Sequence, residues 1–364
     1  MAEFETPAFS KRQVKDAGKV LIGEIGTSAS EVAAAVQTFK IAHNWRAAHI
    51  VPMRHLRSEL SAKARKVGGK KVTVARLTRM QSIRKKLRSA PYTLYQMQDI
   101  GGCRVILETK AAMDELLQIY DREAAHTFRS ESDYVARPKS DGYRSVHRVY
   151  VYKGAGEFSV LNKNSISIEL QFRTRLQHAW ATAVEAVGMV RVEDLKGGGG
   201  DKDWLRLFAL MSAEFAHEEK SPPVPGVQVT KAARQKELIR LDEKLQAIKT
   251  LESYNHAIKF TESTQKAISP IYLIQYNNLT KAVSVHPLSQ ATSAARYNSA
   301  EGNPSINTVL VEVEKVADLK AAYPNYFLDV QMFTERLRLA IHGKPLTIFD
   351  NGWLKRTIEK WKLT

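Results

Sequence analysis

The order of the predicted elements in the centre of the chain constrains the fold more than any other feature. Residues 102–108 (GCRVILE) have the composition of a buried strand, and residues 111–125 have the pattern of an amphipathic helix. Segments 147–154 and 165–174 alternate apolar and polar residues as sheet strands do, and an apolar helix pattern follows at 176–190. This strand–helix–strand–strand–helix order predicts an α/β (α+β) fold in which helices flank a mixed β-sheet.

The N-terminal segment, residues 10–65, is predicted to be helical. Within it, Ser28 and Glu31 have the spacing of a capping box, in front of an alanine-rich stretch with apolar residues three and four apart. Residues 63–74 are predicted to form a basic loop, and residues 74–87 a helix with basic residues on one side. The apolar face of that helix comprises Leu77, Met80, Ile83 and Leu87.

Prolines and a glycine in residues 221–226 (SPPVPG) predict a domain boundary. We therefore expect a first domain over residues 1–225, and a C-terminal helix plus small α/β module over residues 226–364. In this second part the patterns predict a long helix with an apolar stripe from Leu238 to Leu251, a hairpin over 271–288 that turns near Asn277 and Asn278, a strand over 307–315, and helices near 316–322 and 328–342.

Composition excludes several classes of protein. Hydrophobic residues make up 44% of the chain, which suffices for a core, and no apolar run approaches the roughly 20 residues of a membrane helix. The N-terminus also lacks the pattern of a signal peptide, so we expect a soluble, cytoplasmic protein without a membrane partner. The single cysteine, Cys103, excludes an internal disulfide and a cysteine-based zinc site, and its apolar surroundings favour a small buried residue over a nucleophile.

The net charge of +17 is concentrated in segment 1–110, where Lys and Arg far outnumber Asp and Glu. This surplus favours a polyanionic partner, because each Lys or Arg placed on a phosphate releases counterions. On charge alone, a solvated helical surface is the more common explanation. A nucleotide site next to this segment would favour the phosphate-binding interpretation.

Two acidic residues on neighbouring predicted strands are candidates for such a site. Asp99 lies just before Gly101 and a strand, where a hydrated metal and a triphosphate can approach closely. Glu169 alternates along its strand with Gln171 and Arg173, a polar face that a buried core would not tolerate. Since Mg²⁺ prefers one or two carboxylates plus phosphate oxygens, Asp99 and Glu169 are predicted magnesium ligands.

Between these strands lies a basic loop, ARPKSDGYR, with a tyrosine near its end. Arg137, Lys139 and Arg144 supply positive charge, and Gly142 permits a tight turn that we expect to push the ring of Tyr143 outwards. An exposed aromatic ring among cations is typical of a site that stacks a base and holds its phosphates. An ordinary basic turn would explain the charges but not the tyrosine.

These three segments, QDIGGCRVI, DYVARPKSDGYRSVH and IELQFRT, together resemble the synthetase domain of the RelA/SpoT family of alarmone synthetases. The ordered motifs cover roughly positions 70–180. The resemblance implies a nucleotidyltransferase-like fold and a pyrophosphokinase that transfers the β,γ-pyrophosphate of ATP to a ribose 3′-hydroxyl with Mg²⁺.

The resemblance also implies roles for individual residues. Asp99 and Glu169 would hold Mg²⁺, and Glu169 would help to activate the attacking hydroxyl. Tyr143 would stack on the base of the acceptor. The implied ATP-binding residues are Arg76, Ser82, Lys86 and Arg104, and the implied acceptor-binding residues are Lys139, Tyr143, Arg144, His147 and Gln171. One position departs from the family pattern, since Thr78 stands where a basic residue is usual and Arg79 is the candidate replacement.

Only a short segment precedes the resemblance, and it contains no His-Asp pair of the kind that bifunctional members use for hydrolysis. We therefore expect a small, synthetase-only member. The layout is also similar to fused toxin–antitoxin proteins called CapRel, in which the C-terminal part blocks the site until a phage component is sensed. On this basis the main prediction is a toxin that modifies the 3′-CCA end of tRNA, restrained by its C-terminal module and released by a phage protein.

Other interpretations stay open. The enzyme could instead make (p)ppGpp from ATP and GDP or GTP, because the tyrosine would stack either purine. A catalytically inactive RNA-binding module is a third possibility. The C-terminal module could equally be an oligomerisation domain or a nonspecific RNA-binding appendage.

Overall fold

The structure is a computed structural model of the 364-residue chain. It describes residues 4–23, 28–191, 193–227, 230–254, 259–262, 271–277, 279–280, 282–300, 306–313 and 330–346. The helices are α1 (Lys11–Ile22), α2 (Ala29–Ala47), α3 (Ile50–Ala64), α4 (Met80–Ser89), α5 (Lys110–Glu123), α6 (Arg175–Arg191), α7 (Lys202–Glu218), α8 (Lys231–Leu245), α9 (Ala247–Tyr254), α10 (Gln290–Ala300) and α12 (Gln331–Ile341). Three short 3₁₀ segments are η1 (Leu94–Gln96), η2 (Gly156–Asn164) and η3 (Leu195–Gly197).

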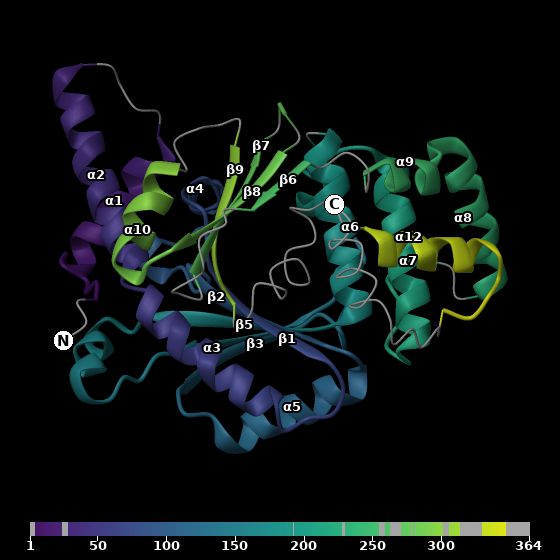
Figure 1. The fold of residues 1–364 in the computed structure, drawn as a ribbon, viewed down its shortest axis with the longest axis horizontal. Coiled ribbons are helices and arrows are strands. Elements are labelled where there is room, and N and C mark those ends of the chain that lie inside the picture. The colour runs from purple at the N-terminus through teal and green to yellow at the C-terminus, as the bar shows by residue number, and fades with distance from the viewer. Residues whose placement is uncertain are drawn as a thin grey trace.

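Nine strands form a single twisted sheet (Figure 1). They are β1 (Lys71–Leu77), β2 (Gly101–Leu107), β3 (Thr127–Asp133), β4 (Val146–Val151), β5 (Ser167–Thr174), β6 (Lys259–Glu262), β7 (Ile271–Asn277), β8 (Ala282–Leu288) and β9 (Ile306–Val313). Their order across the sheet is β3-β4-β5-β2-β1-β9-β7-β8-β6. The pairs β2–β5 and β6–β8 are parallel and the others antiparallel, so the sheet is mixed, as the sequence predicts.

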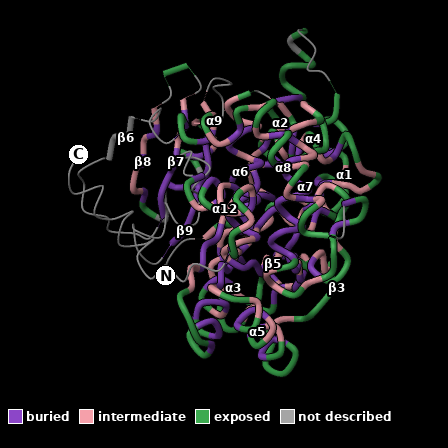
Figure 2. The backbone as a smooth tube through the Cα atoms, turned by 90° about the vertical axis from the view of Figure 1, so that its right-hand side faces the viewer, coloured by how far each residue is buried: buried purple, intermediate pink, exposed green. Residues whose placement is uncertain are grey.

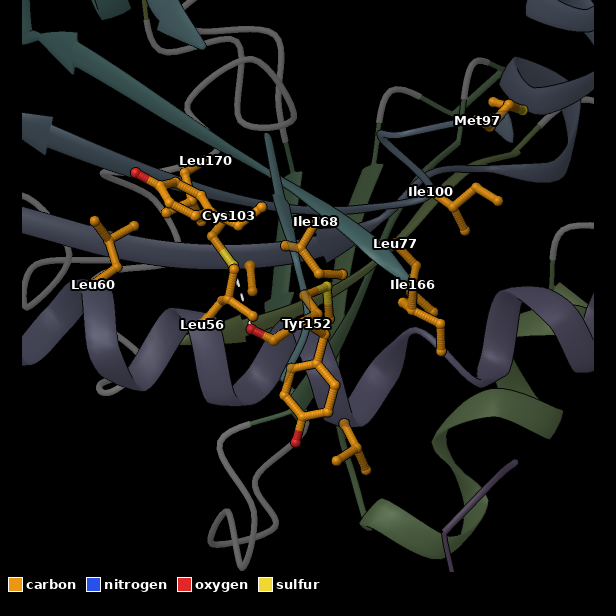
Figure 3. Packing of buried hydrophobic residues seen from close by; sticks show 14 of the residues in the cluster. Leu56, Leu60, Leu77, Met97, Ile100, Cys103, Tyr152, Ile166, Ile168 and Leu170 are labelled. Carbon is orange, nitrogen blue, oxygen red and sulfur yellow. Dashed lines mark hydrogen bonds between the residues drawn. The ribbon is translucent and has the colours of Figure 1, made fainter. Parts of the chain in front are cut away.

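One face of the central strands is packed by α3 and α5, which lie below the sheet in Figure 1. Leu56 and Leu60 of α3 lie against Cys103, Ile168 and Leu170 of the strands, all within one buried cluster (Figure 3). The thiol of Cys103 donates to the carbonyl oxygen of Met53 at 3.3 Å, and burial raises its pKa. Cys103 is thus a small buried residue, as predicted.

A second core lies between α6, α7, α8, α9 and α12, on the right of Figure 1. Trp204 and Phe208 of α7 pack in it together with Phe333 of α12. The residues after the predicted boundary therefore contribute to two places, since α8, α9 and α12 complete this core whereas β6 to β9 extend the sheet. Nothing in this arrangement tests the boundary itself, which stays a prediction.

Several expectations about local structure are confirmed. Segment 10–65 forms three helices, and Ser28 and Glu31 make the capping box, with the Ser28 hydroxyl accepting from the Glu31 amide at 3.3 Å. The predicted hairpin is β7 and β8, paired from Ile271 to Asn277. The helix expected near 316–322 lies outside the described residues.

Others are wrong. Residues 74–77 belong to β1 rather than to a helix, because the helical spacing of the apolar residues continues into α4 and conceals the strand in front of it. The long helix after the boundary is interrupted at Gln246, whose φ of 48° is left-handed. Strand β3 was not predicted; it is an edge strand without a buried face, and Figure 2 shows it on the outside of the molecule.

Candidate active site

The polar face of β5 is the base of the candidate site. Ile168, Leu170 and Phe172 are fully buried on one side of this strand. Glu169 and Gln171 alternate with them and lie half-buried on the opposite side, away from α3 and α5. The predicted polar wall is therefore present.

Four side chains form a continuous hydrogen-bonded series above this strand. Glu169 Oε1 lies 2.8 Å from Nδ1 of His147 on β4, and His147 Nε2 lies 2.7 Å from the hydroxyl of Tyr143. Arg173 then donates from a terminal nitrogen to the same hydroxyl at 2.7 Å. Gln171 donates to Glu169 Oε2 at 2.6 Å, so both oxygens of this carboxylate are held.

Electrostatics within the series follow from these contacts. Burial raises the pKa of Glu169, but hydrogen bonds from His147 and Gln171 and the charge of Lys86 outweigh it and lower the pKa to about 2. Burial also raises the pKa of Tyr143, but the charges of Arg173 and His147 lower it to about 7. For His147, burial lowers the pKa, whereas Tyr143 and Glu169 raise it by more. Glu169 is thus ionised at neutral pH.

Asp99 approaches the same site from the segment just before β2. Its backbone is fixed by Thr78, whose hydroxyl donates to the Asp99 carbonyl at 2.6 Å. Its carboxylate is bound by the ammonium group of Lys86 on α4. The charge of Lys86 also lowers the pKa of Glu169, so this lysine acts on both predicted metal ligands. Ser82 is one turn before Lys86 and lies on the same face of the helix.

Thr78 and Arg79 differ from the expectation drawn from the family pattern. Thr78 is buried, and its hydroxyl donates a hydrogen bond to the backbone carbonyl of Asp99. Arg79 donates to the side chain of Asn307 on β9 at 3.0 Å and so contacts the C-terminal region. The structure therefore gives no support to Arg79 as the replacement for the missing basic residue.

Arg76 and Arg104 lie on neighbouring strands, Arg76 at the level of Glu169 and Arg104 at the level of Gln171. Gly102 is the register partner of both Arg76 and Glu169, and Arg104 donates to Gln171 at 3.3 Å. Across from them, burial raises the pKa of Glu185 on α6, but the charges of Lys196, Arg104 and Arg76 outweigh it and hold the pKa well below 4.5. The structure thus brings the two predicted ATP-binding arginines close to a carboxylate that sequence reasoning missed.

The donor set fits a magnesium–nucleotide site. It offers two carboxylates, of which Glu169 is held ionised, and a lysine cation that is paired with Asp99 and whose charge lowers the pKa of Glu169. Oxygen ligands of this number, completed by phosphate oxygens and water, are what Mg²⁺ requires. Within the described parts of the chain, no three His, Cys, Asp or Glu side chains gather as a metal cluster.

The tyrosine is not exposed at the end of its loop, contrary to the expectation. Tyr143 is half-buried, and its ring makes edge contacts with Tyr134 at 5.6 Å and Trp180 at 6.3 Å between centroids. The ammonium group of Lys139 lies 5.6 Å from the ring centroid. Gly142 has a φ of 91°, and a Cβ there would lie 2.8 Å from the Cβ of Ser212 on α7, so the turn packs inwards against this helix.

Arg144 does not join the predicted acceptor-binding residues. Its guanidinium is buried, and it donates to the Ser212 hydroxyl, to the carbonyl of Val135 and to the carbonyl of Pro222. These partners tie the loop to α7 and to the segment after it. The arrangement indicates a structural role for Arg144, whereas Lys139, Tyr143, His147 and Gln171 do lie together.

Sequence reasoning missed some residues of the site. Trp180, Glu185 and Lys196 surround it from α6 and η3. In the sequence, Glu185 has the pattern of a solvated helical residue. Only the packing of α6 over the strands shows that it belongs to the site. Arg173 was noticed as part of the wall, but its bond to Tyr143 has no local sequence signal.

The central part of the chain is similar in sequence to known proteins. Residues 75–188 match the family described as the region found in RelA / SpoT proteins. The chain is 28% identical over 168 residues to the GTP pyrophosphokinase of Escherichia coli K12, a match that covers 44% of this chain and 21% of that protein. It is 27% identical over 162 residues to the GTP pyrophosphokinase YjbM of Bacillus subtilis, covering 43% and 74%.

Among solved structures, the fold resembles small alarmone synthetase 1 from Bacillus subtilis bound to its product pppGpp, with a TM-score of 0.38 and 21% identity, over 47% of this chain and 91% of that one. It also resembles small alarmone synthetase 2 from the same organism, with a TM-score of 0.39 and 19% identity over 57% and 97%. The chain thus spans about a fifth of the length of the E. coli relative. No helix in the described residues is long and apolar enough to cross a bilayer.

Proposed function

We propose that this protein is a pyrophosphokinase that transfers the β,γ-pyrophosphate of ATP to the 3′-hydroxyl of GDP or GTP, giving (p)ppGpp. The observation that carries the proposal is the ion pair of Lys86 with Asp99, just before strand β2, which pairs with β5 so that Gly102 is the register partner of Glu169. The curated relatives of residues 75–188 are named GTP pyrophosphokinases, which supports guanosine nucleotides as acceptors over the tRNA end. We expect a purely synthetic enzyme without hydrolase activity.

On the donor side, Arg76 and Arg104 would bind the adenine of ATP, and Ser82 and Lys86 its phosphates. Asp99 and Glu169 would hold Mg²⁺, which would neutralise charge on the triphosphate. Lys86 would exchange its contact with Asp99 for one with phosphate. This assignment is supported by the position of α4, which brings both phosphate-binding candidates to the side of Asp99.

On the acceptor side, Tyr143, Lys139, His147 and Gln171 would hold the nucleotide with its 3′-hydroxyl at Glu169. In the reaction the 3′-oxygen bonds to the β-phosphorus, the bond from the β-phosphorus to the oxygen bridging the α-phosphate breaks, and AMP leaves. Glu169 would accept a hydrogen bond from the 3′-hydroxyl and orient it, and the proton of this hydroxyl would pass to water. Such transfers depend mainly on position and charge neutralisation, which suits a carboxylate with a pKa of about 2.

A tRNA acceptor is the second candidate, because the strongly basic character of segment 1–110 suits a polyanion. It would make the protein a translation-blocking toxin with a C-terminal restraint, released by a phage protein. The pairing of β9 with β1 beside Arg76 supports communication between the C-terminal region and the donor side.

The deciding experiment is a transfer assay with γ-labelled ATP and Mg²⁺, in which GDP, GTP and deacylated tRNA are offered separately to the full chain. We expect label on the guanosine nucleotides, and none with Asp99→Ala or Tyr143→Ala. Asp114→Ala, on α5 at the opposite face of the sheet, is the matched control and should transfer normally. Label on tRNA alone would replace the proposed acceptor, and absence of transfer to all three would overturn the proposed activity.

A further inference from the structure

The hydrogen-bonded series above β5 begins and ends on the same strand. Glu169 and Arg173 lie on one face of β5, four residues and therefore about 13 Å apart along it. His147 and Tyr143 bridge this interval with contacts of 2.8, 2.7 and 2.7 Å. The result is a series of contacts whose two ends are fixed to one largely buried strand of the sheet.

Both ring nitrogens of His147 make hydrogen bonds in this series. Because Glu169 is an acceptor, Nδ1 carries the proton that it donates to the carboxylate, and Nε2 shares a hydrogen bond with the Tyr143 hydroxyl. In the register of the sheet, His147 lies opposite Gln171, one polar position beyond Glu169. The imidazole must therefore lean along the strand to reach Glu169, and its second contact, with Tyr143, is what holds it there.

Arg173 makes few other polar contacts within the described part of the chain. It is 2% exposed, its guanidinium carbon lies 5.3 Å from the centroid of the Tyr143 ring, and it donates to the Tyr143 hydroxyl. Its Nε has no hydrogen-bond partner within the described part of the chain. A buried guanidinium with an unsatisfied nitrogen is costly, which indicates that the contact with Tyr143 has a use.

We infer that Arg173 and the hydroxyl of Tyr143 act as a positioning arm that holds His147 against Glu169, so that Glu169 meets the attacking 3′-hydroxyl in one fixed orientation. This inference rests on the proposed function and adds Arg173 to the residues that the reaction requires. It also gives Tyr143 two separable roles. The ring would stack on the acceptor base, and the hydroxyl would act through His147 on the carboxylate.

The two roles predict different results for Tyr143→Phe. If only the ring matters, the phenyl ring still stacks and the variant transfers like the wild type. If the hydroxyl holds the arm, kcat falls about 10- to 100-fold, the size expected when a reacting group is displaced by a fraction of an ångström to about 1 Å. The acceptor KM should change little, because the ring is retained. Arg173→Lys keeps the charge but loses the planar donor, and should lower kcat in the same way.

Matched controls are available elsewhere in the chain. Tyr152 also joins its hydroxyl to a histidine, His55, and Arg148 is a buried arginine paired with Glu131. Neither belongs to the site. Tyr152→Phe and Arg148→Lys should therefore leave kcat and both KM values at the wild-type level after correction for the folded fraction.

The experiment measures kcat and KM for both substrates, together with the ¹⁵N resonances of the His147 side chain, assigned with His147→Gln. We expect the Nε2 resonance of His147 to shift in Tyr143→Phe and in Arg173→Lys, but not in the two controls. Wild-type kcat in Tyr143→Phe, or unchanged His147 resonances in it, would overturn the arm. If the wild type transfers to no acceptor, the proposed function fails, while the resonances still test the contacts.

Discussion

Arg76 on β1 lies directly opposite Val311 on β9 in an antiparallel ladder. A predicted ATP-binding residue and a strand from the C-terminal region are therefore neighbours in one sheet. The next position of β9 carries Glu312, a buried acid bound by Arg54 at 3.0 Å and Arg57 at 3.1 Å, both on α3. The C-terminal region is thus attached to the N-terminal part of the chain both by backbone pairing, with β1, and by a buried ionic group, with α3.

The first prediction concerns Glu312. Glu312→Gln should lower the free energy of unfolding by about 3–5 kcal/mol, because it leaves two largely buried arginines without their counter-charge. Urea unfolding of the full chain measures this. Glu243→Gln, at an exposed position of α8, is the control and should change the free energy by less than about 0.5 kcal/mol. Equal effects of the two substitutions would show that the buried group does not hold β9.

The second prediction concerns removal of residues 227–364. Loss of β9 would expose the edge of β1, and loss of α8, α9 and α12 would uncover the apolar side of α7. We expect the shortened chain to aggregate or to melt at a much lower temperature, as judged by light scattering and circular dichroism. A monodisperse shortened chain with higher transfer activity would contradict this expectation and would support restraint by the C-terminal region.

The third prediction concerns Glu185, which faces Lys196, Arg104 and Arg76. A carboxylate there would repel the triphosphate of ATP and compete with the adenine for the two arginines. Glu185→Gln should therefore lower the KM for ATP about two- to fivefold, in line with partly screened charge pairs. Steady-state kinetics at two salt concentrations tests this, because added salt should reduce the difference. A raised KM would instead show that Glu185 orients the arginines for ATP.

The fourth prediction separates two basic residues of the same loop. Arg144→Ala should destabilise the fold by about 2 kcal/mol or more, because it removes a buried guanidinium with three protein acceptors. Lys139→Ala should leave stability unchanged but raise the acceptor KM, since this exposed lysine lies over the rings of Tyr134 and Tyr143. Thermal melting and kinetics on both variants test the separation.

Arg137→Ala is the control for both, because Arg137 is an exposed basic residue of the same loop. It should change neither the melting temperature nor the acceptor KM. If Arg144→Ala melts like the wild type and raises the acceptor KM, Arg144 belongs to the acceptor site after all.

The parts of the site that the sequence predicted are those encoded by local pattern. The alternation of Glu169, Gln171 and Arg173 with buried Ile168 and Leu170 shows within one short strand, because a strand has a side-chain period of two. The strand–helix order around them is equally local. Both follow from residues that are close together in the chain.

The parts that it did not predict depend on contacts between distant residues. The pairing of Arg76 with Val311 joins positions that are far apart in the chain, and no local signal announces it. The inward position of Tyr143 depends on the close packing of Gly142 against Ser212, which lies on α7. The position of Glu185 depends in the same way on how α6 packs over the sheet.

The last prediction concerns acid stability and His49. This side chain is fully buried, its Nδ1 contacts the Trp45 carbonyl at 2.8 Å, and burial lowers its pKa from 6.5 to about 4. Its contribution to stability is therefore complete above pH 6.5 and is lost as the pH falls towards 4, because the unfolded chain takes up a proton that the folded protein refuses. Between pH 7.5 and pH 5, titration of His49 should lower the free energy of unfolding of the wild type by about 2 kcal/mol. The decrease in His49→Gln should be smaller by this amount. Urea unfolding at both pH values measures this difference. His49→Gln is compared with His342→Gln, at an exposed position, whose free energy of unfolding should fall as much as that of the wild type. If the free energy of His49→Gln also falls as much as that of the wild type, His49 does not titrate in this way.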